Sequence, residues 1–340
     1  MRFPTLALVL LLLGAAQAAA QPYAYVSNSS SNSVSVIDDA TETVVATIPT
    51  GINPWGVTVS PDGTRVYVPN QGSNDLTVID ATSNTVLTTL PMGATARGAM
   101  VSPDSSEVYV ASGNSVQVVD SATNTVVATV AGLSTPYFLD FLPDGSRALV
   151  ANSGNGTVSA IDTATRTIVQ TYTVPSGAIN LAISPDGSKA YVTSGSGPEA
   201  VSLDLGTGVA TPITGTTFTA GVDFSADGSR AYLANWTNGN VLTVDTATNA
   251  VIQTTPTAPD LIGASLSPDG SRLYVANRQL GRVDILDTTT LAVVGSVLVG
   301  GSPYSIGNMF VTGSFLSPGV ALDASPAAPR IYAEEIVASP

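Results

Sequence analysis

Short apolar segments alternate with polar turns along most of the chain, and one unit near its end shows the pattern in full. Its first apolar segment, residues 262–266, leads to the turn Pro268-Asp269-Gly270, and a β-branched and aromatic segment, residues 273–275, follows. A third segment spans residues 283–287 and a fourth spans residues 292–299. Val, Ile and Tyr suit pleated strands, and Pro-Asp-Gly favours a tight turn. The pattern therefore predicts four short antiparallel strands.

The same unit recurs at intervals of about 42 residues, which is typical of a propeller blade. An aromatic residue or leucine marks the second strand at Tyr25, Tyr67, Tyr109, Leu149, Tyr191, Tyr232 and Tyr274. An aspartate ends the third strand at Asp38, Asp80, Asp120, Asp162, Asp204, Asp245 and Asp287. The turn before the second strand reads Pro-Asp-Gly or a close variant at residues 61–63, 103–105, 143–145, 185–187, 226–228 and 268–270. Both marker series predict seven blades, one of which lacks the turn.

The missing turn is explained if the two ends of the chain build one blade together. The chain enters the repeat at a second strand, residues 23–27, and leaves it at a first strand near residues 303–310. Pairing of these segments would close the ring and hide two sheet edges. We therefore expect an all-β fold, a seven-bladed β-propeller of four-stranded antiparallel blades. Its last blade is closed by the N-terminal strands and the C-terminal inner strand.

The two ends of the sequence differ from the repeats. Arg2, the apolar run at residues 6–13 and the small residues that follow are typical of a cleaved export signal. That run is shorter than the roughly 20 residues of a membrane span. We expect a signal peptide at residues 1–20, the propeller at residues 21–313 and a flexible Pro/Ala-rich tail at residues 314–340. A periplasmic or extracellular location follows, with no membrane span after signal removal; a retained anchor is the alternative.

Composition narrows the possible partners and chemistry. Removal of residues 1–20 takes away one basic residue of 11 and no acidic residue, so 10 basic residues remain against 25 acidic ones, a formal charge of −15. This charge disfavours binding to nucleic acid. Without cysteine or histidine, the chain can form neither disulfides nor Ser-His-Asp, Cys-His or imidazole–metal sites. We expect a monomer and name no catalytic or metal-binding residue. The cofactor is unknown, and a carboxylate mechanism or oxygen-bound calcium stays open.

The repeats also resemble a known family. Ser60-Pro61-Asp62-Gly63, Tyr67-Val68-Pro69-Asn70 and Val78-Ile79-Asp80-Ala81-Thr82 are similar to the YVTN-type, YncE-like repeats of seven-bladed propellers in secreted and surface-layer proteins of bacteria and archaea. The resemblance covers roughly residues 23–310 and implies the architecture. Similar propellers serve as lactone hydrolases and related ones hold quinone or haem cofactors, so the resemblance leaves the activity open.

Most of the repeated polar residues have a structural interpretation. The aspartates at third-strand ends and in Pro-Asp-Gly turns are expected to accept backbone hydrogen bonds in their own turns. Basic residues beside these turns are expected to form a solvated ring that offsets the aspartates: Arg65, Arg147, Lys189, Arg230 and Arg272. Asparagines that end second strands are interpreted as loop positions with positive φ, or alternatively as a polar binding lip: Asn28, Asn70, Asn152, Asn235 and Asn277.

Departures from the repeat are the best indicators of function, because selection for folding alone would keep the blades alike. They gather at the starts of the inner strands, which in this topology surround the mouth of the central channel. The candidate ligand-binding residues at this mouth are Trp55, Arg97, Tyr137, Asn180, Phe218, Asp260 and Tyr304. A concave site with aromatic walls and a few polar groups is a typical place for a ligand. The alternative is that these residues only pack at the blade entrances.

Two functions fit these features. The first is an exported, non-catalytic binding or scaffold module that binds a protein, a glycan or a small molecule at the channel mouth. The second is a lactonase-like hydrolase or a quinone-type cofactor-binding enzyme that uses the same mouth, with Asp260 as its candidate acid. We favour the first, because the repeats are symmetric and the usual catalytic residues are missing.

Overall fold

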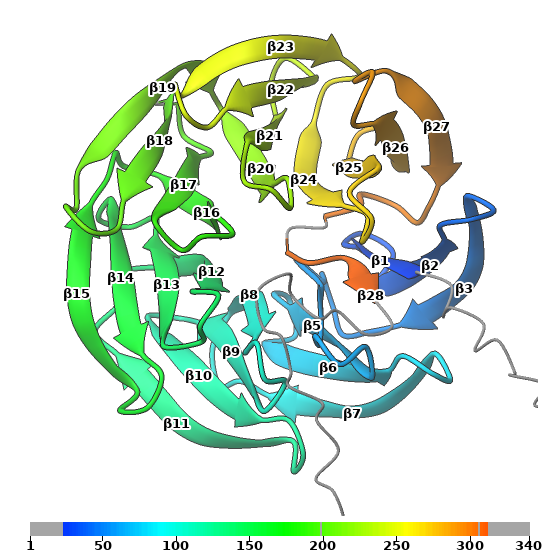
Figure 1. The fold of residues 1–340 in the computed structure, drawn as a ribbon. Coiled ribbons are helices and arrows are strands. Elements are labelled where there is room, and N and C mark those ends of the chain that lie inside the picture. The colour runs from blue at the N-terminus through cyan, green and yellow to red at the C-terminus, as the bar shows by residue number, and fades with distance from the viewer. Residues whose placement is uncertain (1–22, 198, 305–306, 312–340) are drawn as a thin grey trace, which may run out of the picture.

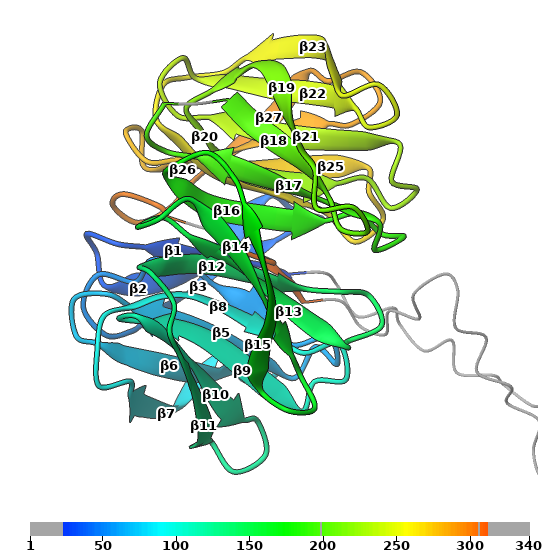
Figure 2. The ribbon, with the colours of Figure 1, turned by 90° about the vertical axis from the view of Figure 1, so that its left-hand side faces the viewer.

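The computed structural model describes residues 23–197, 199–304 and 307–311. In this part of the chain the strands form seven four-stranded antiparallel sheets around one axis (Figure 1). Figure 2 views the ring from the side, with the blades lying next to one another around it. The predicted seven-bladed β-propeller is therefore confirmed. No helix among the described residues has the length and hydrophobicity of a membrane span.

Each blade runs from an inner strand at the axis to an outer strand at the rim. The inner strands are β4 (Thr58–Val59), β8 (Ala96–Val101), β12 (Pro136–Phe141), β16 (Ala178–Ile183), β20 (Thr219–Phe224), β24 (Leu261–Leu266) and β28 (Phe310–Val311). The second strands are β1 (Tyr23–Asn28), β5 (Arg65–Asn70), β9 (Glu107–Ser112), β13 (Arg147–Asn152), β17 (Lys189–Ser194), β21 (Arg230–Asn235) and β25 (Arg272–Asn277).

The third strands are β2 (Ser33–Asp38), β6 (Asp75–Asp80), β10 (Ser115–Asp120), β14 (Thr157–Asp162), β18 (Glu199–Asp204), β22 (Asn240–Asp245) and β26 (Arg282–Asp287). The outer strands are β3 (Thr43–Pro49), β7 (Thr85–Pro91), β11 (Thr125–Ala131), β15 (Thr167–Thr173), β19 (Ala210–Thr217), β23 (Ala250–Pro256) and β27 (Val293–Leu298). Blades 1 to 6 begin at β4, β8, β12, β16, β20 and β24, and the closing blade has the order β28-β1-β2-β3.

The closing blade joins the two ends of the chain as expected. Tyr23 pairs with Val311 and Ala24 with Phe310, and the Tyr25 N–H donates to the Met309 carbonyl at 2.7 Å. The Phe310 ring packs edge-on against Tyr274 of blade 6 at 4.8 Å. The regular inner strand is shorter than predicted, because only Phe310–Val311 pairs as a strand while Pro303 forms an isolated bridge to Asn28.

Two faces of the ring follow from this topology. We call the aspartate face the one that carries the turns between first and second strands and between third and fourth strands. The asparagine face carries the loops between second and third strands and the loops between blades. Tyr23 pairs with both Asp38 and Val311, so the described chain begins and ends at the aspartate face. The predicted signal peptide and tail, residues 1–20 and 314–340, lie outside the described residues.

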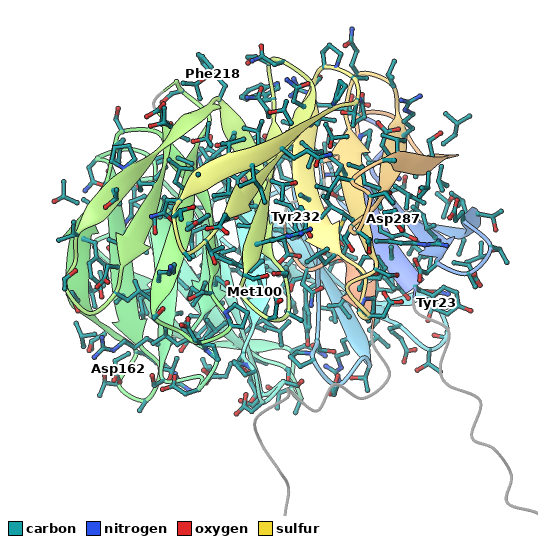
Figure 3. All side chains as sticks on the ribbon, turned by 45° about the horizontal axis from the view of Figure 1, so that its top comes forward. Tyr23, Met100, Asp162, Phe218, Tyr232 and Asp287 are labelled. Atoms are coloured by element: carbon teal, nitrogen blue, oxygen red, sulfur yellow. The ribbon has the colours of Figure 1, made fainter. Side chains whose placement is uncertain are left out.

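The aspartates at the third-strand ends stabilise their own turns as expected. Asp80, for example, accepts from the Thr82 N–H at 2.9 Å and from the Ser83 N–H at 2.8 Å. These bonds, led by the one from Ser83, lower the pKa of the Asp80 carboxyl. The repeated carboxylates are therefore held in separate turns of the ring; Figure 3 labels two of them, Asp162 and Asp287.

The basic ring differs from the expectation, because most of its members bridge neighbouring blades. Lys189 of blade 4 donates to the Thr246 carbonyl of blade 5 at 2.8 Å, and Arg230 of blade 5 donates to the Thr288 carbonyl of blade 6 at 3.4 Å. Arg65 makes the same link from blade 1 to blade 2. Each of these side chains satisfies a turn carbonyl of the next blade rather than only offsetting charge in solvent.

The asparagines at the second-strand ends are also placed differently from the expectation. None of the five adopts a positive φ, and all are buried. The amide of Asn70 donates to Thr77 Oγ1 at 2.9 Å, and Asn152 donates to Ser159 Oγ at the same distance. Asn28 fastens the second strand to the third strand in the same way, whereas the amides of Asn235 and Asn277 donate to the Thr217 and Ala258 carbonyls at the connections between blades. All five are therefore buried structural residues rather than an exposed polar lip.

Six of the outer strands carry a β-bulge at the same place. In each, one apolar residue has no partner on the third strand: Val45, Leu87, Val127, Val169, Ile252 and Val294. All six side chains are exposed. A bulge twists a sheet edge and makes it a poor template for another strand, so these bulges disfavour edge-to-edge pairing of the outer strands.

Candidate functional site

A hollow of about 570 Å³ opens on the asparagine face at the end of the central channel. Four aromatic side chains form much of its wall: Trp55, Tyr137, Trp236 and Tyr304. Three serines, Ser153, Ser176 and Ser196, add hydroxyl groups, and Arg278 is the cation in its lining. The volume lies within the range of about 300–1,000 Å³ that is common for small-molecule sites.

Three of the aromatic residues occupy equivalent places in different blades. Each follows a proline that pairs with the last residue of a second strand: Pro54 with Asn70, Pro136 with Asn152 and Pro303 with Asn28. Trp55, Tyr137 and Tyr304 therefore project from the same level of blades 1 and 3 and the closing blade. The fixed backbone angle of proline and the bridge behind it hold each aromatic residue at the mouth.

The rings of these three residues pack against one another, with Trp55 in contact with both tyrosines, and we call this group the aromatic layer. Trp55 and Tyr304 are stacked, with ring centroids 4.7 Å apart and an angle of 11° between the planes, and Trp55 lies 5.3 Å from Tyr137. Burial raises the pKa of the Tyr304 hydroxyl well above its usual value, so this side chain remains neutral at physiological pH. Stacked aromatic residues of this kind offer a rigid, flat surface at little cost in side-chain entropy.

Arg278 is held at the hollow by three neighbours. Its Nε donates to Asp260 Oδ2 at 2.9 Å, and its guanidinium carbon lies 5.4 Å from the Trp236 ring and 6.0 Å from the Tyr304 ring. The Asp260 N–H donates to the Trp236 carbonyl and the Asp260 carbonyl accepts from the Arg278 N–H. The loops of blades 5 and 6 are thus tied together around one oriented guanidinium group.

A second guanidinium group lies beside the aromatic layer. The Arg97 carbon Cζ is 5.1 Å from the centre of the Tyr137 ring. Its Nε and Nη1 atoms are buried and have no hydrogen-bond partner among the described residues. Arg97 is half-buried and forms no ion pair with a described residue, so a positive charge stands beside Tyr137.

The structure brings together most of the sequence-predicted residues but not all. Trp55, Tyr137 and Tyr304 line the hollow, Arg97 contacts Tyr137, and Asp260 acts through Arg278. The other two point elsewhere. Asn180 is buried, with its amide donating to the Ala220 carbonyl at 3.2 Å. Phe218 has a positive φ and is 37% exposed, and Figure 3 labels it at the outline of the molecule.

The residues predicted from the sequence did not include several that line the hollow, among them Ile179, Trp236, Arg278 and the three serines. Ile179 follows Ala178, the partner of Ser194, and so is the equivalent of Tyr137. Trp236 and Arg278 each come directly after a second-strand asparagine, where other blades have Ser153 or Gln71. Other blades have small or neutral residues at this loop position. The large side chain of Trp236 and the charge of Arg278 were therefore the signals in the sequence that could have identified them.

Beneath the mouth, Phe138, Ala220 and Ile262 pack with Tyr304 in an apolar cluster. On the other side of this cluster, a second hollow of about 340 Å³ belongs to the aspartate face. Figure 3 labels Met100, one of its lining residues, near the middle of the ring. The aromatic hollow and the channel are therefore separate spaces.

Two aspartates of this channel tie neighbouring inner strands together. Asp140 accepts from the Ile183 N–H at 2.9 Å, and Asp223 accepts from the Leu266 N–H at 2.8 Å. Burial raises the pKa of Asp140 to about 7, with a smaller contribution from the charge of Asp223, and burial raises the pKa of Asp223 to about 6. Among the described residues, no group of three or more carboxylates is placed to hold a metal ion.

This architecture, a closed ring of seven antiparallel blades with a hollow at the channel mouth, defines the chain as a seven-bladed β-propeller. Residues 13–102 match the model of the YNCE-like β-propeller family. This match spans 90 of the 340 residues (13 to 102), and together with the seven blades it supports the resemblance to YncE-like seven-bladed propellers. No curated protein matches the chain.

Several solved structures share the fold. Hydrazine synthase from Kuenenia stuttgartiensis is 22% identical, with a TM-score of 0.53, over 84% of this chain and 86% of that chain. The dihydro-heme d1 dehydrogenase NirN in complex with DHE is 17% identical, with a TM-score of 0.64, over 81% of this chain and 62% of that chain.

A functionally unknown protein from Desulfotomaculum acetoxidans is 16% identical, with a TM-score of 0.68, over 84% of this chain and 99% of that chain. At these identities the similarities establish the fold alone. Because two of these three structures are named as enzymes and the third has no known function, the shared fold does not decide between binding and catalysis.

Proposed function

We propose that the protein is an exported, non-catalytic binding module that holds a ligand in the aromatic hollow of the asparagine face. One observation carries the proposal: the hollow forms where the chain departs from its own repeat. Trp55, Tyr137, Trp236 and Arg278 replace small or aliphatic residues found at equivalent places in other blades, such as Ala220 and Ser153. Folding of a blade does not require such residues, so their convergence favours a ligand.

The composition of the hollow favours a small molecule or a sugar unit of a glycan. Flat aromatic walls with a few hydroxyl groups suit a ring-shaped ligand that stacks and forms a small number of directed hydrogen bonds. A protein partner would bind here by inserting one side chain. The export signal is part of this proposal, as are the periplasmic or extracellular location and the monomeric state.

The chain contains two tryptophans, and both line the hollow. Selective excitation of tryptophan therefore reports on this site alone, and a screen of small molecules and glycans by fluorescence should find compounds that quench or shift the emission. The double variant Trp55→Ala/Tyr137→Ala should weaken the binding of such a compound at least tenfold, because it removes half of the aromatic wall. Calorimetry measures this loss.

Phe218→Ala is the matched control, because it removes an aromatic side chain on the same face but outside the hollow. It should leave binding unchanged, and thermal unfolding should show that both variants fold. Full binding by the double variant would rule out this hollow as the site.

The enzyme alternative stays a prediction with its own test. Asp260 is the candidate acid at the mouth, and the structure engages one of its oxygens with Arg278. Turnover of a lactone that is lost in Asp260→Asn, or a metal or quinone that copurifies in stoichiometric amount, would favour an enzyme. A protein free of cofactor and inert toward a panel of lactones would count against it.

A further inference from the structure

Positive charge in the form of two guanidinium groups is concentrated around the aromatic layer of the hollow. Arg97 lies on the Tyr137 ring, and Arg278 lies between the Trp236 and Tyr304 rings. One carboxylate, that of Asp260, is paired with Arg278, and no acidic residue of the described chain lines the hollow itself. Two positive charges against one negative charge leave a net positive site on a chain whose formal charge is −14.

This arrangement argues against a cationic ligand. Aromatic surroundings often bind ammonium groups through the faces of their rings. Here the faces of Tyr137, Trp236 and Tyr304 already have a protein cation within about 6 Å, the usual reach of the interaction. A second cation would meet Arg97 and Arg278 and be repelled, whereas a negative group would be attracted to both.

Arg278 is oriented for recognition of an acid. Its Nε is engaged by Asp260 while a third of the side chain remains exposed at the hollow. Asp260 and the Trp236 ring fix the plane of the guanidinium group, so little side-chain entropy is lost when its free nitrogens bind an oxyanion. A fixed guanidinium group that has donors to spare is the usual partner of a carboxylate.

We infer that the ligand of the hollow is a small organic acid, whose ring packs against the aromatic wall of the hollow and whose carboxylate pairs with Arg278. The inference rests on the proposed function and specifies its ligand class. Arg97 contributes an unneutralised charge beneath Tyr137 that strengthens the attraction. Asp260 is a positioning residue that acts through Arg278.

Two matched pairs of probes test this inference on the full-length protein near neutral pH. The first pair is 2-naphthoate and 2-naphthol, which have the same ring with and without an acid group. The second pair is galacturonate and galactose, which have a sugar ring in place of the aromatic ring. Comparison of the two pairs shows which kind of ring the hollow binds. Tryptophan fluorescence and calorimetry measure the dissociation constants.

The acid of at least one pair should bind at least tenfold more tightly than its neutral partner. Arg278→Gln should remove most of that preference, and Arg278→Lys should keep part of it, because lysine retains the charge but not the flat group held by Asp260. Arg147→Gln, the same substitution on a second strand at the aspartate face, should leave the preference unchanged.

The outcomes separate the inference from the proposed function. If acid and neutral rings bind equally, or if Arg278→Gln keeps the full preference, the inference is wrong although the hollow still binds a ring. If none of the four probes binds or alters the tryptophan emission, the inference is overturned, and the proposed function must then rest on its own wider screen.

Discussion

At the scale of single residues, the same side chain serves opposite purposes according to its surroundings. The turn aspartates, such as Asp80 and Asp120, accept backbone hydrogen bonds that stabilise the charged form and lower the carboxyl pKa. The channel aspartates, Asp140 and Asp223, also accept backbone hydrogen bonds, but burial outweighs these bonds and raises their pKa to about 7 and about 6. Position in the fold therefore decides which carboxylates titrate near neutral pH.

The raised pKa of Asp140 predicts a pH-dependent stability. Between its unfolded value near 4 and its folded value of about 7, the folded protein binds more protons at Asp140 than the unfolded chain does, so the free energy of unfolding should fall as the pH rises through this range. Asp223 acts in the same direction up to about pH 6. Urea unfolding at pH 5 and pH 8 should show lower stability at pH 8.

The variant Asp140→Asn tests whether Asp140 causes this dependence of the free energy of unfolding on pH. The variant is expected to be less stable overall, because its amide nitrogen cannot accept the Ile183 N–H, but the difference between pH 5 and pH 8 should shrink. The chain contains no histidine, so no imidazole titrates in this range. An unchanged difference would show that Asp140 is not the titrating group.

At the scale of elements, the blades are joined by polar contacts between the second strand of one blade and the turn of the next as well as by apolar packing. Tyr25 reaches Asn84 of blade 1 and Tyr191 reaches Asn249 of blade 5, each at 2.6 Å. Between blades 2 and 3 the acidic residue, Glu107, is on the second strand and the basic residue, Arg166, is in the turn of the next blade. This is the reverse of the pair formed by Arg272 on a second strand and Glu42 in a turn. The contact between blades therefore forms whichever of its two positions carries the acidic residue.

The contact that closes the ring should be measurable by mutation. Arg272 of blade 6 donates to the Asp39 carbonyl at 3.1 Å and to Glu42 Oε1 at 2.6 Å, both in the closing blade. Arg272→Gln should lower the free energy of unfolding by about 1 kcal/mol, the scale of a partly exposed charged contact. Urea unfolding measures the loss.

Arg147→Gln is the control for this variant, because Arg147 occupies the equivalent position in blade 3 but donates no side-chain hydrogen bond to a described residue. Its stability should stay close to that of the unaltered protein. Equal losses in the two variants would mean that the contacts of Arg272 add nothing to stability.

At the scale of the whole molecule, stability depends on closure. A ring of sheets buries both sides of every blade only if the first and last blades meet. Here the seam is the pairing of Tyr23 and Ala24 with β28, backed by the contact of Phe310 with Tyr274. An open ring would expose the inner edge of β1 and the apolar surface that Phe310 covers.

Two truncations test the seam. A chain that ends at residue 301 loses Pro303, Met309 and Phe310, and we expect a lower melting temperature and aggregation through the exposed edge of β1. A chain that ends at residue 313 keeps the seam and should melt like the complete protein. Circular dichroism and light scattering distinguish the two results, and equal melting temperatures would show that closure is dispensable.

The sequence by itself determined the blades, because the contacts that define six of the seven blades are local. Turn residues, strand alternation and the terminal aspartate act within about 42 residues, so a repeating pattern is enough to predict seven sheets and their closure. It also located Trp55, Tyr137 and Tyr304, which follow prolines at recognisable places. These predictions needed only periodicity and turn chemistry.

Only the tertiary structure decided which side chains meet at the mouth. Register shifts in the inner strands, such as that between Pro136 and Leu139, rotate successive residues by amounts that the sequence does not reveal. Asn180 points away from the hollow, while Ile179 lies in its wall. Phe218 precedes its inner strand, has a positive φ and lies outside the hollow. Trp236 and Arg278 come from loops of two neighbouring blades and gain their role only because the ring brings those loops together.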